Sequence, residues 1–96
     1  MAFTVPQSKK SIKQNRFEFE IEGTTFEVPL LKFAPVAAAE AFEQGQEVKG
    51  LLLMCENDAA RDAVRDLDGE QFGALMEAWQ KASGVEAGES PASSNS

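Results

Sequence analysis

An alternating run of apolar and acidic residues between positions 17 and 28 constrains the fold more than any other feature of the sequence. A period of two places the apolar side chains on one face of a strand and the carboxylates on the other. Gly23, followed by Thr24, can take the positive φ of a tight turn. Pro29 ends the second strand or lies at an edge, because it has no N–H to donate. The pattern predicts a β-hairpin with one solvated face. Its inward side chains are Phe17, Phe19, Ile21, Phe26 and Val28, and its outward carboxylates are Glu18, Glu20, Glu22 and Glu27.

Beyond the hairpin, apolar residues recur at the spacing of helices. Residues 36–44 are rich in Ala and Glu, which favour helix, with Pro35 in the first turn and Gly45 as the stop. A second helix is predicted over residues 46–56, although Gly50 weakens it. The sequence thus predicts two short helices in succession.

Two further helices are marked by their caps. Asn57 or Asp58 can cap the third helix, and Asp68 can cap the fourth, where Gln71 completes a pair like a capping box. Gly84 then ends the fourth helix. The apolar stripes are Ala60, Ala63, Val64 and Leu67 in the third helix and Phe72, Leu75, Met76 and Trp79 in the fourth.

The predicted fold class is α+β, an N-terminal β-hairpin followed by a small bundle of three to four helices. Residues 16–84 are expected to form this single domain. Residues 1–15 are predicted to be a flexible basic arm and residues 85–96 a disordered tail, because both segments are polar and have little apolar surface to bury.

The composition lacks most of the side chains that catalysis and metal binding use. The chain has 96 residues, one cysteine and no histidine, so no disulfide within the chain, histidine-based triad or metal site is expected. Cys55 has no cationic neighbour in sequence and is predicted to be a small buried apolar residue. We therefore predict a protein that is not an enzyme and uses no metal or cofactor. A domain of about 70 residues without a disulfide or a bound metal has only marginal folding stability as a monomer. This favours weak homo-oligomers or binding to other partner chains.

The net charge of −7 is distributed unevenly along the chain. Residues 1–16 carry four basic side chains and no acid, whereas residues 17–96 carry five basic and sixteen acidic ones. An acidic body disfavours nucleic acid, since binding to phosphates needs clustered Lys and Arg. The basic arm is most simply a solvated tail. The alternatives are contact with RNA or DNA and pairing with the acidic body of a neighbouring copy.

The start of the sequence does not resemble a signal peptide, and the longest apolar run, residues 51–55, is too short to cross a bilayer. We therefore expect an intracellular protein that does not contact membranes.

The same apolar run is a candidate partner-binding surface. Four consecutive large apolar residues cannot all face one side of a helix, so part of the run is left over once the core is filled. The alternative is a central helix that is buried on two sides. Trp79 is either an interface anchor or a core residue. The candidate partner-binding residues are Leu51, Leu52, Leu53, Met54 and Trp79.

Several segments occur in an order that is similar to a known family. They are Phe17-Glu18-Phe19-Glu20-Ile21 with Gly23, Phe26-Glu27-Val28-Pro29-Leu30-Leu31-Lys32-Phe33, Leu75 with Trp79, Ser83-Gly84-Val85 and Gly88-Glu89-Ser90. In this order the chain resembles, over residues 15–90, the short tail assembly chaperones of long-tailed bacteriophages of the siphovirus type.

The resemblance implies a non-catalytic protein that acts in the host cell cytoplasm during phage assembly and is not expected in the mature virion. Family members bind the tape measure protein, keep it soluble and help recruit tail tube subunits. The family also commonly makes a longer product by programmed ribosomal frameshifting, and Gly88-Glu89 is compatible with a slippery codon run. The expected partners are therefore the tape measure protein, tail tube subunits and a longer frameshifted form of the chain itself.

Two other functions remain open on the sequence. One is a structural virion protein, such as a tail or head completion subunit, which persists in finished particles. The other is an acidic inhibitor that mimics DNA. That function needs a continuous acidic surface, for which the candidates are Glu18, Glu20, Glu22 and Glu27.

Overall fold

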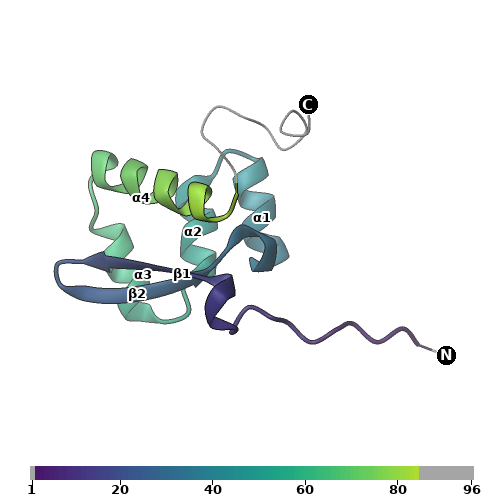
Figure 1. Ribbon diagram of the computed structural model, residues 1–96. Helices are drawn as coiled ribbons and strands as arrows, with labels where there is room; N and C mark the ends of the chain where they lie inside the picture. Colours follow the sequence, from purple (N-terminus) through teal and green to yellow (C-terminus); the bar gives the residue numbers. More distant parts are fainter. Residues whose placement is uncertain (1, 85–96) are drawn as a thin grey trace.

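A two-stranded antiparallel hairpin and the helices that follow it make up the computed structural model, which describes residues 2–84 (Figure 1). The strands are β1 (Arg16–Ile21) and β2 (Thr24–Pro29), and the helices are α1 (Val36–Glu43), α2 (Glu47–Met54), α3 (Asp58–Arg65) and α4 (Gly69–Ala82). Short 3₁₀ turns at Lys13–Asn15 and Leu31–Phe33 flank the hairpin. The α+β class predicted from the sequence is confirmed, while the predicted tail, residues 85–96, lies outside the described residues.

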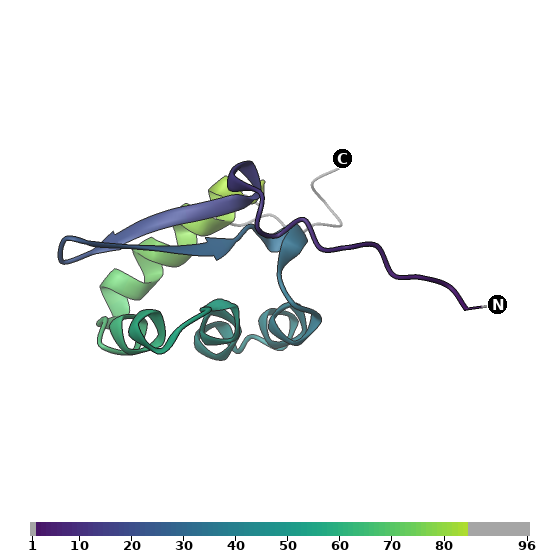
Figure 2. The ribbon, with the colours of Figure 1, turned by 90° about the horizontal axis from the view of Figure 1, so that it is seen from below.

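The elements are arranged in two layers. Helices α1, α2 and α3 lie in a row, with α2 in the middle, and the hairpin and α4 lie side by side against that row (Figures 1 and 2). Helix α4 contacts the hairpin through β1. Within the part of the chain that the structure describes, no helix is long and apolar enough to cross a membrane.

The hairpin turn lies one residue earlier than the sequence pattern indicates. Thr24 pairs with Ile21 and belongs to β2, so the connection consists of Glu22 and Gly23. Their φ angles are +50° and +85°. A two-residue connection with positive φ at both positions matches the right-handed twist of the paired strands. This preference outweighs the cost of placing Glu22 in a left-handed conformation.

The alternation predicted for the hairpin is confirmed by its burial. Phe19 and Val28 are buried, and the other three inward residues are half-buried against the same core. Three rings run along this inner face, with centroids 6.1 Å apart for Phe17 and Phe19 and 5.8 Å apart for Phe19 and Phe26. The hairpin therefore contributes an aromatic surface to the core.

Side-chain caps mark where α3 and α4 begin, whereas α1 and α2 have no side-chain cap. Asn57, and not Asp58, caps α3, because its side chain accepts a 2.8 Å hydrogen bond from the N–H of Ala60. An N-cap needs an extended backbone, and the chain accordingly leaves α2 after Met54 and not at Glu56 as predicted.

Helix α4 has both of its predicted end signals. Asp68 and Gln71 form a reciprocal capping box, with hydrogen bonds of 2.8 and 2.9 Å. At the other end Gly84 has a φ of +86°, a conformation that costs an L-residue with a side chain about 1–2 kcal/mol. These two signals account for the length of the helix.

The core lies between the two layers, and Trp79 of α4 is one of its central residues. Trp79 is 2 % exposed, and its indole donates a hydrogen bond to the carbonyl of Pro29. The ring of Phe42 packs against it with centroids 5.1 Å apart. Phe42 in turn lies over the backbone of Gly50, where a Cβ would come within 2.7 Å of the ring. Gly50, which weakens α2 as an isolated helix, therefore allows α1 and α2 to pack closely.

The N-terminal segment is tied to the domain from Lys9 onward, although the sequence suggested a flexible arm over residues 1–15. The side chain of Asn15 donates a hydrogen bond to the carbonyl of Lys9, and Arg16 donates one to the carbonyl of Lys10. The carbonyl of Asn15 accepts a hydrogen bond from the N–H of Leu30.

Residues 2–8, in contrast, run away from the body of the molecule (Figure 1).

A groove at the tip of the hairpin

A hollow of about 610 Å³, lined by both apolar and polar residues, opens between the tip of the hairpin and helices α3 and α4. Its size falls within the range of about 300–1,000 Å³ that is usual for binding pockets. The hairpin supplies its inner face near the turn, and the two helices supply the opposite wall. The apolar lining residues are Phe19, Ile21, Phe26, Ala63, Leu67, Ala74 and Leu75. We call this hollow the tip groove.

The tip groove exists because the core is incomplete at this end. Ile21, Phe26, Leu67 and Leu75 each keep part of their surface in contact with solvent. The eight-residue α3 ends at Arg65, and the chain then turns at Asp68 into α4. The two helices therefore border the end of the hairpin without covering it.

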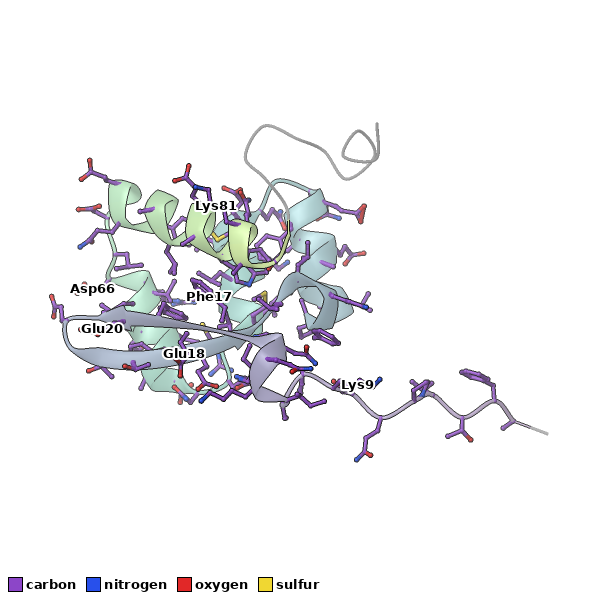
Figure 3. The ribbon with its side chains drawn as sticks, viewed as in Figure 1. Lys9, Phe17, Glu18, Glu20, Asp66 and Lys81 are labelled. Atoms are coloured by element: carbon purple, nitrogen blue, oxygen red, sulfur yellow. The ribbon has the colours of Figure 1, made fainter. Side chains whose placement is uncertain are left out.

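The rim of the tip groove is acidic. The acidic residues among its lining are Glu20 and Glu22 from the hairpin and Asp66 from the link between α3 and α4, and all three are exposed. Figure 3 shows Glu20 and Asp66 at the same end of the molecule. No basic side chain is among the lining residues that the structure describes. A groove of this kind attracts a partner that carries positive charge beside an apolar stripe.

The residues that the sequence suggested for partner binding lie elsewhere, in α2 and α4. Leu51, Met54 and Trp79 are each 2 % exposed or less, and in the folded chain their side chains are not accessible to a partner. Leu52 is half-buried against the core, and Leu53 is 42 % exposed. Helix α2 is the middle helix of the row, so it is buried on two sides (Figure 2), which is the alternative that the sequence left open. An accessible surface on this run is confined to Leu53 and part of Leu52.

The tip groove itself was not identified from the sequence. Its lining residues belong to stripes that the sequence assigned to the core, and periodicity does not reveal which part of a stripe stays uncovered. The one available signal was the alternation that continues to Ile21, beside the turn. When the inward face of a strand stays apolar up to its last residue, another part of the structure or a partner has to bury that last side chain.

A second acidic region, on the outer face of the hairpin, is partly neutralised. Glu18 and Glu27 are cross-strand neighbours, and Arg16 binds Glu27 with an N–O distance of 2.7 Å. The same guanidinium binds both carboxylate oxygens of Glu56. Burial lowers the pKa of Arg16, but its hydrogen bonds to Glu56 and Glu27 outweigh that effect and raise the pKa above its ordinary value. The acidic surface that a DNA mimic needs is therefore interrupted at Glu27.

The single cysteine is a core residue, as the sequence predicted. Cys55 is 3 % exposed. Burial raises the pKa of its thiol, the positive charge of Arg61 partly opposes this, and Glu56 adds to it. The thiol therefore stays protonated near neutral pH. Among residues 2–84, no group of three or more acidic or cysteine side chains is placed to hold a metal ion.

The tip groove has the features of a site for a polypeptide. Apolar side chains, two of them aromatic, and three carboxylates line it together, a combination that suits an amphipathic segment. Comparisons of the chain with protein-family models, with curated proteins and with solved structures found no match.

Proposed function

We propose that this protein is a tail assembly chaperone of a long-tailed bacteriophage. In this proposal it binds the tape measure protein, keeps that protein soluble in the host cytoplasm and helps recruit tail tube subunits. The observation that carries the proposal is the uncovered tip groove. Apolar surface that a small protein leaves exposed usually marks a site where another polypeptide binds. The order of sequence segments that resembles the chaperone family supports the same conclusion.

The tip groove also indicates which part of a partner it binds. A tape measure protein is a long helical chain with apolar stripes, and an amphipathic helix docks by laying its apolar face into a groove. The carboxylates of Glu20, Glu22 and Asp66 favour stripes that are flanked by Lys or Arg. Many copies bound along one long partner gain strength through avidity, so each single contact can be weak.

Co-expression with the tape measure protein encoded nearby tests the proposal, and two alanines of α4 provide a matched pair of variants. Ala74 lines the tip groove, whereas Ala78 is likewise exposed one turn further along and does not line it. Ala74→Arg fills the groove and adds positive charge to its rim, and Ala78→Arg makes the same change outside it.

The wild type and Ala78→Arg are expected to keep the tape measure protein in the soluble fraction. Ala74→Arg is expected to weaken its binding about fivefold or more, since overpacking costs about 1–3 kcal/mol. The proposal is wrong if the tape measure protein is equally insoluble with and without the wild-type chain. If both arginine variants behave alike, binding takes place at another surface.

Mass spectrometry of purified virions separates a chaperone from a structural virion protein. We expect the chain to be missing or scarce in finished particles, because its role ends when the tube has polymerised. An amount close to that of other tail subunits contradicts this expectation. A longer frameshifted product is also part of the proposal, and Gly88-Glu89, where we expect the slippage, lies outside the described residues.

A further inference from the structure

The N-terminal arm, residues 2–8, carries apolar side chains that nothing in the described chain covers. Phe3 is 84 % exposed and Val5 is 77 % exposed. The arm leads into Lys9, Lys10 and a further lysine, with no acidic residue before Arg16. An apolar segment next to a cluster of positive charge is the complement of an apolar groove with an acidic rim.

We propose that the arm of one molecule binds in the tip groove of a second copy of the same chain. Phe3 and Val5 are two residues apart, so in an extended segment their side chains point to the same side and can enter the groove together. Lys9 and Lys10 then lie near the carboxylates of the rim. This inference goes beyond the proposed function, because it requires no other protein.

The backbone of the arm is suited to this contact. Pro6 has a fixed φ and restricts Val5 to extended conformations, which lowers the entropy lost on docking. From Phe3 to Lys9 an extended chain spans at most about 20 Å. That length allows Phe3 to reach the floor of the groove while the lysines remain in solvent at its edge.

The geometry of the arm favours a second copy over the groove of its own molecule. The arm is fixed at Lys9 and Lys10 by hydrogen bonds from Asn15 and Arg16, at the end of the hairpin opposite to the turn. Figure 3 shows Lys9 at one end of the molecule and Glu20 and Asp66 at the other. From its anchor the arm runs away from the body (Figure 1).

The arm and the tip groove are different surfaces, so the contact is heterologous. Each molecule offers one arm and one groove, so copies associate either by exchanging arms in a closed dimer or ring or by continuing from copy to copy. The lysines and the carboxylates are exposed, so the association is expected to weaken as salt rises and screens them.

Sedimentation equilibrium of the full chain at low salt tests this inference with two complementary variants and a control. Phe3→Ser disables the arm and keeps the groove, and Ala74→Arg blocks the groove and keeps the arm. Val36→Ser is the control, because Val36 is as exposed as Phe3 (84 %) and lies in α1, outside the groove. The wild type and the control are expected to show a mass that rises with concentration.

Each of the two variants alone is expected to associate at least tenfold more weakly than the wild type, because a buried Phe side chain contributes more than a tenfold factor in affinity. An equimolar mixture of the two is expected to restore association but to stop at a one-to-one pair, since only one intact arm and one intact groove remain. This restoration shows that Phe3→Ser keeps a folded groove, and far-UV circular dichroism checks that Ala74→Arg is folded.

A wild type that stays monomeric at all concentrations overturns the inference, and so does self-association that Phe3→Ser leaves unchanged. A mixture that associates no better than its separate components overturns it as well. The two partners compete for the same groove, but sedimentation measures self-association and co-expression measures soluble tape measure protein, so the failure of one proposal can be told from the failure of the other.

Discussion

The indole N–H of Trp79 donates a 3.0 Å hydrogen bond to the main-chain carbonyl of Pro29, which lies 50 residues away in sequence. The bond connects the last part of α4 to the end of β2. Pro29 has no N–H of its own, so the strand ends there, and its buried carbonyl needs a partner from outside the sheet. Trp79 supplies that partner and fills the core beside Phe42 at the same time.

Replacing Trp79 by Phe is expected to destabilise the domain. The change leaves the buried carbonyl of Pro29 unpaired, which costs about 1–3 kcal/mol, and the smaller ring adds a packing loss. Urea unfolding followed by far-UV circular dichroism measures the change, since the chain has no other tryptophan to report it. Val36→Ala, at an exposed site, should stay within about 0.5 kcal/mol of the wild type. Equal stability of the Trp79→Phe variant and the wild type contradicts the role assigned to this bond.

Two helical glycines are expected to respond oppositely to the same substitution. Gly50→Ala places a Cβ within 2.7 Å of the Phe42 ring, whereas the Cβ added at Gly73 in α4 meets nothing within 4 Å beyond its chain neighbours and the backbone of its own helix. We expect Gly73→Ala to stabilise the domain by about 0.5–1 kcal/mol through helix propensity. Gly50→Ala is expected to destabilise it by about 1–3 kcal/mol through overpacking. Thermal unfolding of both variants provides the measurement, and a gain at both sites contradicts the close packing of α1 and α2.

The ion pairs of Arg16 are expected to depend on the shape of the guanidinium. Its side chain is 10 % exposed and binds Glu27 and Glu56 at once. A lysine ammonium cannot span both carboxylates with the same planar geometry. Arg16→Lys should therefore cost about 1 kcal/mol, a value kept low because both glutamates are partly exposed and screened. Arg65→Lys at an exposed site is the control and should change stability little. An equal loss at both positions rules out a special role for Arg16.

The turn of the hairpin offers a stabilising substitution. Glu22 has a φ of +50°, and asparagine tolerates this left-handed conformation better than glutamate. Glu22→Asn is expected to raise the free energy of unfolding by about 0.5–1 kcal/mol. The midpoint of thermal unfolding should rise, and Glu20→Asn on the strand before the turn should not reproduce the effect. A lowered midpoint for the turn variant contradicts the assigned geometry.

The buried thiol of Cys55 predicts a loss of stability at alkaline pH. Its pKa is raised in the folded state, so the folded chain holds this proton more tightly than the unfolded chain does. The stabilisation is complete below the unfolded pKa of 9.0 and is lost as the pH rises through the folded value. Urea unfolding at pH 7.5 and at pH 10 should show a larger alkaline loss for the wild type than for Cys55→Ala. Identical losses in the two proteins exclude this contribution.

Local signals were enough to predict most of the secondary structure. The alternation from Phe17 to Val28 predicted the hairpin, and the capping box of Asp68 and Gln71 and the stop at Gly84 predicted α4. Each of these signals acts over a few residues and does not depend on the rest of the fold. Two errors were small shifts at boundaries, where Glu22 entered the turn and Cys55 left α2. A larger one was the arm over residues 1–15, which is tied to the domain from Lys9 onward.

The candidate site depends on how distant elements meet, and sequence patterns do not contain that information. Leu51 and Met54 looked like spare apolar surface, but α1 and α3 flank α2 and the core buries both side chains. Leu67 and Leu75 looked like ordinary core residues, but the ends of the hairpin and of α3 leave them half-covered. Which leucine stays accessible is decided by tertiary packing.

Ser83 accepts a 3.0 Å hydrogen bond from the N–H of Leu31, and the chain then leaves α4 through the positive φ of Gly84. Every residue that lines the tip groove precedes this point. Two polypeptides that share residues 1–84 and differ afterwards therefore have the same lining of the tip groove.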